Sequence, residues 1–465
     1  MKKLSILIKK LPFLISILII ALISNCINNI KPWEKEENVI NWDVISYYGY
    51  LPATFIYHDY TLKFVENYNG PHKFTIWYIK APNGGNVIMT SMGMAMLYSP
   101  FFFSGHAAAS IFGYDTGGYS EPYRLALIIS SIFYLALGLF FLSKISLKFF
   151  NPIISAWIIL ITVLGTNLFF YATYSSTMSH TYSFALITMF LWFTIKWHET
   201  QKVKFAVILG VLIGLISLVR PTNIVIVFFF IFWNVRDYSD LPVRFRYFLQ
   251  NYKALIIIAV LSILIWIPQF LYWKSITGSF FYYSYGEENK FFFNNPMIIK
   301  GLIGYRHGWL VYSPVMIFSV LGMFVLIKRF NEMLIPVVFT FLVFIYVVFS
   351  WWCWWYGGAF GMRSMIDIYG LLALPLGAFF TYILEWKKIW QWGVIFVSVL
   401  LLIAGLHNTH KYRSFSSHYD SMTKEAFWDS YLKVKPSPSF ESKLRAPDYE
   451  KARKGIDAYA GEGSE

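Results

Sequence analysis

Long apolar runs recur along almost the whole of this 465-residue chain, and they limit its fold more than any other feature. Only 14% of the residues are charged and 57% are hydrophobic, whereas about a quarter of the residues in a soluble domain are charged. An apolar stretch of about 20 residues is long enough to cross a bilayer as a helix. The pattern therefore predicts an all-α polytopic membrane protein.

The chain is predicted to cross the membrane about 11 times, with its N-terminus inside. We interpret the first apolar run as an uncleaved helix, because Asn25 before Cys26 is a poor fit to the small residue of a signal cleavage site. The predicted spans are 11–29, 123–143, 152–171, 179–196, 204–219, 221–235, 254–273, 308–328, 332–350, 366–384 and 391–406.

Two segments decide this topology. Segment 86–113 is apolar enough to span, but a crossing there would move the Lys- and Arg-bearing loops that follow out of the cytoplasm, against the positive-inside rule. Pro100 also favours two shorter pieces, so we place the segment at the outer interface. Segment 204–235 is too long for one span, and Arg220-Pro221 within "LVRPTN" predicts two short helices that meet at an outer turn.

This topology divides the chain into three parts. Residues 1–273 form a seven-span module with a large outer loop, 30–121, that carries interfacial helices after the first span. Residues 274–406 form a four-span module with outer loops 274–307 and 351–365. The tail 407–465 is polar and mixed in charge, and by span count it lies outside. Its segments "KPSPSFESK" and "AGEGSE" are predicted to be loose. No internal repeat is visible, which counts against the repeat-built transporter folds.

The net charge of +14 does not predict a nucleic-acid partner. The Lys and Arg residues are spread over short loops, where they orient membrane proteins, and are not gathered into one basic stripe. The two cysteines, Cys26 and Cys353, give neither a disulfide framework nor a metal-ligand spacing.

Unusual polar residues collect at the predicted outer face. Each has a structural alternative: Asp43 caps an interfacial helix, Asp59 and His180 are satisfied within the fold, Arg220 snorkels to the interface, and the Trp-rich stretch 351–355 is an aromatic belt. Arg363 follows three glycines that permit a close approach of the backbone, and Asp367 stands four residues on, at a spacing that allows a helical ion pair.

A carboxylate and arginines at one membrane face suit a particular chemistry. The carboxylate can take a proton from an acceptor hydroxyl. A guanidinium forks onto phosphate oxygens and stabilises a phosphate leaving group. A sugar carried on a lipid phosphate requires both functions.

Several motifs in order resemble the integral-membrane glycosyltransferases of the GT-C superfamily, which includes protein O-mannosyltransferases and the aminoarabinose transferases of lipid A. An acid, Asp43, follows the first span, and "YYGYLPATFIY" and 86–113 take the place of interfacial helices. "LVRPTN" is similar to the Arg-Pro turn of bacterial members. "WWYGGAFGMRSMIDIYGLLALPL" resembles their W-x-G-G-x-x-F-G-x-R segment, and "YRHGWLVYSPV" resembles their segment before span 8. The likeness covers about residues 10–406.

The resemblance implies transfer of a sugar from a polyprenyl-phosphate donor to a glycan, lipid or protein hydroxyl. The site would face outward from a bacterial cytoplasmic membrane, among membrane lipids. Asp43 would be the general base or orient the acceptor, with Asp59 as the nearest second acid. The implied donor-phosphate ligands are Arg363, Arg306, His307 and Arg220, and the implied substrate-lining residues are Tyr47, Tyr48, His180, Trp355 and Tyr356.

One departure concerns the acids. Many members carry two adjacent acidic residues in the first loop, but here Val44 follows Asp43. Some relatives bind a divalent cation, and this chain shows no clear pair of ligands for one, so no cofactor or metal site is assigned. Two alternatives remain open: an O-antigen polymerase or ligase, whose large loop falls late in the chain, and a lipid-linked glycan transporter or flippase, whose charges line a path through the bilayer.

Overall fold

The computed structural model describes residues 2–68, 76–433 and 435–458. Helices dominate these ranges, which confirms the all-α prediction. The β structure within them is a short antiparallel pair, β1 (Ile79–Lys80) and β2 (Asn86–Val87), and an isolated bridge between Phe291 and Trp351. Residues 69–75 of the predicted outer loop 30–121 and the "AGEGSE" end of the tail lie outside the described residues.

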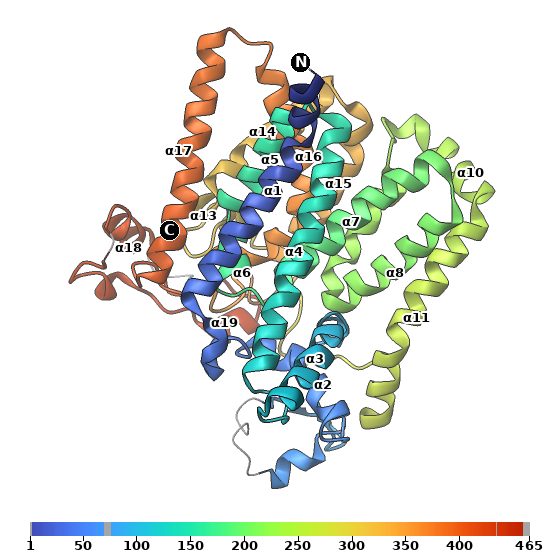
Figure 1. Ribbon diagram of the computed structural model, residues 1–465, viewed down its shortest axis with the longest axis vertical. Coiled ribbons are helices and arrows are strands. Elements are labelled where there is room, and N and C mark those ends of the chain that lie inside the picture. Colours follow the sequence, from blue (N-terminus) through green and yellow to red (C-terminus); the bar gives the residue numbers. More distant parts are fainter. Residues whose placement is uncertain (1, 69–75, 434, 459–465) are drawn as a thin grey trace.

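The helices form an elongated bundle (Figure 1). In the first half of the chain they are α1 (Lys2–Ile30), α2 (Asp43–Phe55), α3 (Gly93–Phe112), α4 (Glu121–Phe149), α5 (Pro152–Leu164), α6 (Leu168–Thr173), α7 (Ser179–Thr200), α8 (Val203–Val219), α9 (Val227–Phe232), α10 (Leu241–Gln250) and α11 (Tyr252–Thr277). The second half has α12 (Ile298–Ile303), α13 (Trp309–Tyr312), α14 (Ile317–Lys328), α15 (Asn331–Phe349), α16 (Tyr369–Ile383), α17 (Lys388–Arg413), α18 (Lys424–Ser430) and α19 (Tyr449–Arg453).

Short 3₁₀ helices connect or extend several of these elements. Those that matter for the site are η5 (Pro221–Ile226), after the Arg220 break, and η8 (Arg363–Ile368), which leads into α16. Another, η6 (Tyr238–Asp240), leads into α10. The remaining ones are η1 (Pro32–Glu34), η2 (Glu36–Asn38), η3 (Lys63–Asn67), η7 (Pro314–Met316) and η9 (Glu441–Lys443).

Helix lies in every range predicted to span, and the polytopic membrane class stands. Among the described residues, six helical segments are long and apolar enough to cross a membrane: Ile8–Glu34, Glu121–Phe149, Tyr252–Thr277, Asn331–Phe349, Arg363–Ile383 and Lys388–Arg413. The other predicted spans fall on shorter or less apolar helices, namely α5 with α6, α7, α8, η5 with α9, and α13 with α14. The total of about 11 crossings therefore stays a prediction.

Helix α16 lies at the centre of the bundle, and two long helices lie on its outside. The apolar window of segment Arg363–Ile383 is 89% buried, and α16 packs against α14, α4, α5 and α7. The equivalent windows of α11 and α17 are only 17% buried, and these helices run along opposite flanks in Figure 1. Such apolar, unburied helices are suited to contact with lipid.

Helices α2 and α3 lie at the end of the bundle away from the N-terminus (Figure 1). Helix α3 runs through Pro100 without interruption, so the expected division of this segment at Pro100 is wrong. Proline removes the N–H that would bond to the carbonyl of Met96. The hydroxyl of Ser99 donates to that carbonyl instead, at 2.8 Å, which satisfies the acceptor and lets the helix continue.

The prediction that "KPSPSFESK" is loose is also wrong, because its Lys443 pairs with Asp429 at 3.2 Å and its Phe440 is buried. Phe440, within "KPSPSFESK", is 3% exposed. Arg306 donates from Nε to the carbonyl of Asp420 and from Nη2 to that of Arg445, both at 2.7 Å. These bonds tie the tail to the loop before α13, because a buried guanidinium satisfies several carbonyls at once. Composition alone does not reveal such a partner.

The close contact of α14 with α16 gives a test of the packing. A Cβ at Gly322 would lie 1.8 Å from the carbonyl oxygen of Pro375, whereas a Cβ at Gly393 in α17 meets no atom within 4 Å. Overpacking of this kind costs about 1–3 kcal/mol, while alanine in place of an unconstrained helical glycine gains about 0.5–1 kcal/mol. We expect Gly322→Ala to lower the thermal unfolding temperature in detergent and Gly393→Ala to leave it equal or higher. Equal stability of the two variants would contradict this packing.

Candidate functional site

An ion pair joins two residues that are 320 positions apart. Nη1 of Arg363, at the start of η8, donates to Oδ2 of Asp43, in the first turn of α2, at 2.9 Å. The Arg363 side chain is 13% exposed and that of Asp43 is 37% exposed. A largely buried cation therefore meets a carboxylate that remains accessible. We call this the outer pair.

The sequence around Asp43 explains its position. Residues Val44 to Ala53 of α2 are all buried, and they fix the helix against α3. The residue before the helix is Trp42, with φ 46°, and no side chain caps the helix there. The capping role considered for Asp43 is thus not what its carboxylate does, because it reaches Arg363 instead.

A second cluster surrounds Asp367, whose side chain is 0% exposed. Its Oδ1 lies 2.9 Å from Nδ1 of His180, at the start of α7. Its Oδ2 accepts from Nδ2 of Asn223 at 2.9 Å and lies 3.2 Å from Nε of Arg220. We call Asp367, His180, Arg220 and Asn223 the Asp367 cluster. It joins η8 to the first turn of α7 and to the break between α8 and η5.

Arg363 and Asp367 do not pair with each other, although their spacing allowed it. Residues 363–368 form a 3₁₀ helix. With three residues per turn, residues four apart do not lie on one face as they do in an α-helix. Each residue therefore finds its partner on another element, Arg363 on α2 and Asp367 on α7 and η5.

Arg220 is held in place rather than snorkelling into water. Its side chain is 15% exposed, its Nε faces Asp367, and its guanidinium lies 5.5 Å from the centre of the Tyr356 ring. Cation–π contacts of this kind strengthen where water is excluded. Tyr356, predicted to line the substrate, thus supports one of the predicted phosphate ligands.

The neighbouring residues Tyr47 and Tyr48 of α2 point to different surroundings. Tyr47 lies 3.3 Å from the Ser179 hydroxyl and is close enough to Asp43, Arg220 and Arg363 to interact with their charges. Tyr48 donates to the carbonyl of Gly118 and packs against aromatic rings of α3 and its following loop. Successive helical residues point about 100° apart, so only Tyr47 faces the outer pair.

Two further tyrosines approach the site without having been predicted. Tyr171, from α6, packs its ring 5.4 Å from that of His180. Tyr285, from the loop 274–307, interacts electrostatically with Tyr47, Arg220 and Asp43, and burial raises the pKa of its hydroxyl. Both lie in aromatic-rich stretches, where no local signal distinguishes them from anchoring residues. Asn223 was also missed, although it stands three residues after Arg220 in "LVRPTN".

Asp59 organises its own loop. Its carboxylate accepts from the backbone N–H of Thr61 and of Phe64, each at 3.0 Å. Burial by itself would raise the pKa of the Asp59 carboxyl. The hydrogen bonds from these N–H groups and from the Thr61 hydroxyl have the larger effect, so the pKa lies below its ordinary value. A carboxylate so satisfied is a weaker base, and these contacts favour the structural alternative for Asp59.

Arg306, His307 and Trp355 belong to the junction with the tail. His307 lies between the carbonyls of Trp355, 2.7 Å from Nδ1, and Tyr419, 2.8 Å from Nε2. The Trp355 ring is fully buried against Trp354 and Tyr449. With Arg306 bound to tail carbonyls, these surroundings give no support to phosphate binding by Arg306 and His307 or to substrate lining by Trp355.

Two arginines and two carboxylates, which balance in charge, lie together near the start of α2. Arg363 and Arg220 lie beside Asp43 and Asp367. Within the described ranges, no three His, Cys, Asp or Glu side chains gather in a way that could hold a metal ion. The arrangement is suited to holding an anion between two fixed guanidinium groups.

Comparison with known proteins gives matches to solved structures alone: no family model matches the sequence, and no curated protein matches it. The chain is similar to the archaeal oligosaccharyltransferase AglB from Archaeoglobus fulgidus in complex with an inhibitory peptide and a dolichol-phosphate, at 13% identity and a TM-score of 0.45, over 94% of this chain and 61% of that chain. It is also similar to the oligosaccharyltransferase of that organism in its apo form, at 13% identity and a TM-score of 0.44, over 94% and 61% of the two chains. For the same oligosaccharyltransferase in complex with Zn and sulfate, the identity is 16% and the TM-score is 0.43, over 93% of this chain and 58% of that chain.

This chain therefore spans about three-fifths of the length of these oligosaccharyltransferases. The roles proposed below rest on the side chains of this chain.

The Asp367 cluster gives a prediction about stability. Removing one partner of a buried ion pair leaves an uncompensated charge and costs about 3–5 kcal/mol. We expect Asp367→Asn to lower the thermal unfolding temperature strongly, and Asp367→Asn combined with Arg220→Gln to recover part of the loss, because the two changes are coupled. Glu66→Gln, at an exposed pair with Lys80, serves as the control. Additive losses in the double variant would contradict the coupling.

Proposed function

We propose that this protein is a glycosyltransferase that moves a sugar from a polyprenyl-phosphate donor to an acceptor hydroxyl at the outer face of the membrane. The observation that carries the proposal is the outer pair, Asp43 with Arg363, beside an Arg220 that is fixed by Asp367. The acceptor belongs to a glycan, a lipid or a protein.

The two arginines hold the donor phosphate. Guanidinium groups form forked, charge-assisted hydrogen bonds with phosphate oxygens. Nε of Arg363 is buried and has no hydrogen-bond partner among the described residues. Arg220 is oriented in advance by Asp367 and Tyr356, so its charge needs little rearrangement when negative charge develops on the leaving phosphate.

Asp43 acts on the acceptor. Its carboxylate is accessible, and it accepts the proton of the acceptor hydroxyl while that oxygen forms a bond to the anomeric carbon of the sugar. The bond from this carbon to the phosphate oxygen breaks, and its electron pair stays with the phosphate beside the arginines. Direct attack from the face opposite the phosphate gives inversion.

The ion pair gives this reaction an order. In the outer pair, Oδ2 of Asp43 is occupied by the hydrogen bond from Arg363. When the donor phosphate takes over Arg363, Asp43 loses this partner and its carboxylate becomes available to the acceptor hydroxyl. Donor binding therefore precedes activation of the acceptor.

Replacement of the two residues of the outer pair separates their roles. We expect Asp43→Asn to lower transfer of radiolabelled sugar by about 10²–10⁴-fold, the size of a lost general base, while donor binding is kept. Arg363→Ala is expected to weaken donor binding as well as transfer. The measurement is label transfer from a panel of polyprenyl-phosphate sugars to native membrane extract, with expression and insertion checked for each variant.

Glu66→Gln, in the same loop as Asp43, is the matched carboxyl-to-amide control and should transfer at the wild-type rate. Wild-type transfer by Asp43→Asn would exclude its role as the base. If no donor were consumed and labelled lipid instead crossed proteoliposomes, the protein would be a transporter and the proposal would fail.

A further inference from the structure

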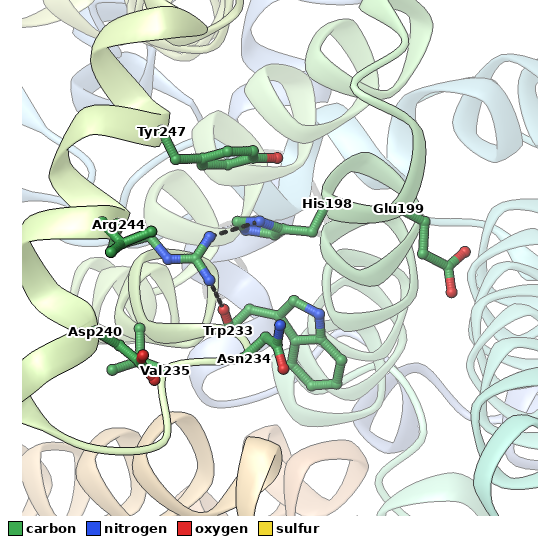
Figure 2. A pocket seen from close by; sticks show the side chains of 9 residues that line it. His198, Glu199, Trp233, Asn234, Val235, Asp240, Arg244 and Tyr247 are labelled. Atoms are coloured by element: carbon green, nitrogen blue, oxygen red, sulfur yellow. Dashed lines mark hydrogen bonds between the residues drawn. The ribbon is translucent and has the colours of Figure 1, made fainter.

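A cavity of about 380 Å³ lies at the other end of the bundle from the outer pair. Its walls are the end of α7, the turn after α9, and η6 with α10, and its lining residues include His198, Trp233, Asp240 and Arg244 (Figure 2). Helix α7 begins beside Asp367, and a helix of its length extends about 33 Å. The cavity is therefore a separate site from the one proposed for sugar transfer.

Arg244 is fixed on one wall of this cavity. Its Nη1 donates to Nδ1 of His198 at 3.0 Å, and its Nη2 donates to the carbonyl of Trp233. Since Nδ1 of His198 accepts this hydrogen bond, the ring proton is on Nε2, which donates to the carbonyl of Phe230 at 2.9 Å. The imidazole is therefore neutral. Figure 2 shows Arg244 pointing at His198, with Tyr247 on one side and Trp233 on the other.

The positive charge of Arg244 has no ion-pair partner. Among the residues that the structure describes, its polar contacts are with His198 and the Trp233 carbonyl, and no carboxylate lies within ion-pair distance of it. The bonds to His198 and Trp233 use two of the five N–H groups of the guanidinium. Asp240 acts on this charge only from beyond ion-pair distance, and Nε of Arg244 has no hydrogen-bond partner among the described residues. The wall can therefore offer further N–H donors and a positive charge to an anionic group.

Two carboxylates also line the cavity, and they differ in their partners. Glu199 is paired with Lys196 at 2.8 Å and also with Lys148. Asp240 accepts at Oδ2 from the backbone N–H of Arg236 at 2.9 Å and has no cationic side chain within ion-pair distance among the described residues. The cavity thus holds a cation, Arg244, and an anion, Asp240, which interact electrostatically but do not form a direct ion pair. A ligand with both charges fits it better than an anion alone.

One exposed face of α10 is apolar. Leu241, Phe245 and Leu249 are 43%, 66% and 58% exposed and stand four residues apart, so they form one stripe on the helix. The stripe leads directly into α11, an apolar span that is only 17% buried. A short amphipathic helix at the end of a lipid-facing span lies at the level of the headgroups.

We propose that this cavity binds the headgroup of a zwitterionic phospholipid with a primary amine. Its phosphate would contact Arg244, its ammonium would contact Asp240, and its acyl chains would lie along the stripe of α10. A volume of about 380 Å³ is at the small end of ligand pockets, which suits a headgroup rather than a whole lipid.

Lipid binding to the purified, delipidated protein tests this site. Native mass spectrometry would compare phosphatidylethanolamine, phosphatidylcholine and phosphatidylglycerol. We expect the ethanolamine lipid to bind most tightly in wild type, because choline has no N–H to donate to Asp240 and the glycerol headgroup has no cation. Arg244→Gln should weaken its binding about tenfold, as expected for one lost charge-assisted contact.

Two further variants complete the test. Asp240→Asn should remove the preference for ethanolamine over choline, while Arg246→Gln, at an exposed residue of the same helix, should bind as wild type does. Equal affinity of wild type for the three lipids, or equal binding by Arg244→Gln and Arg246→Gln, would overturn the proposal. If Arg244→Gln did not fold, the headgroup preference of wild type and its loss in Asp240→Asn would still decide.

Discussion

Charged side chains at one end of an apolar bundle must neutralise one another. In this chain the outer pair and the Asp367 cluster provide that neutralisation. A buried carboxylate without partners is very costly, yet Asp367 is 0% exposed. Its partners come from α7, from the α8–η5 break and from η5, while Arg363 draws α2 onto η8. The same contacts hold the helices together and place two guanidinium groups beside an accessible carboxylate.

This arrangement can change partners without losing neutrality. A donor phosphate brings negative charge to Arg363 and can replace Asp43 there, whereas Arg220 keeps Asp367. Arg363 would then bind the phosphate in place of Asp43, while Arg220 would keep its orientation against Asp367. The Asp367 cluster would serve as the rigid part of the site, and the outer pair as the part that responds to substrate.

The sequence could predict which charged residues matter but not how they are paired. Asp43 and Arg363 stand out because charges are rare in their surroundings, yet a separation of 320 residues carries no local signal of contact. The helical spacing of Arg363 and Asp367 suggested a pair, and the 3₁₀ geometry of η8 removes it. Arg306 and His307 were predicted to bind the donor phosphate. They instead contact backbone carbonyls of the tail, at Asp420 and Tyr419, and composition gives no sign of such partners. Continuity of α3 through Pro100 had a local signal, the adjacent Ser99.

The central claim is that Arg363 exchanges Asp43 for the phosphate of a lipid-linked sugar. A cryo-electron microscopy structure of the protein with bound polyprenyl phosphate tests it most directly. The account predicts phosphate oxygens within hydrogen-bonding distance of Arg363 and Arg220, a separated Asp43–Arg363 pair, and an unchanged contact between Asp367 and Arg220. A phosphate bound away from both arginines, with the outer pair intact, would contradict it.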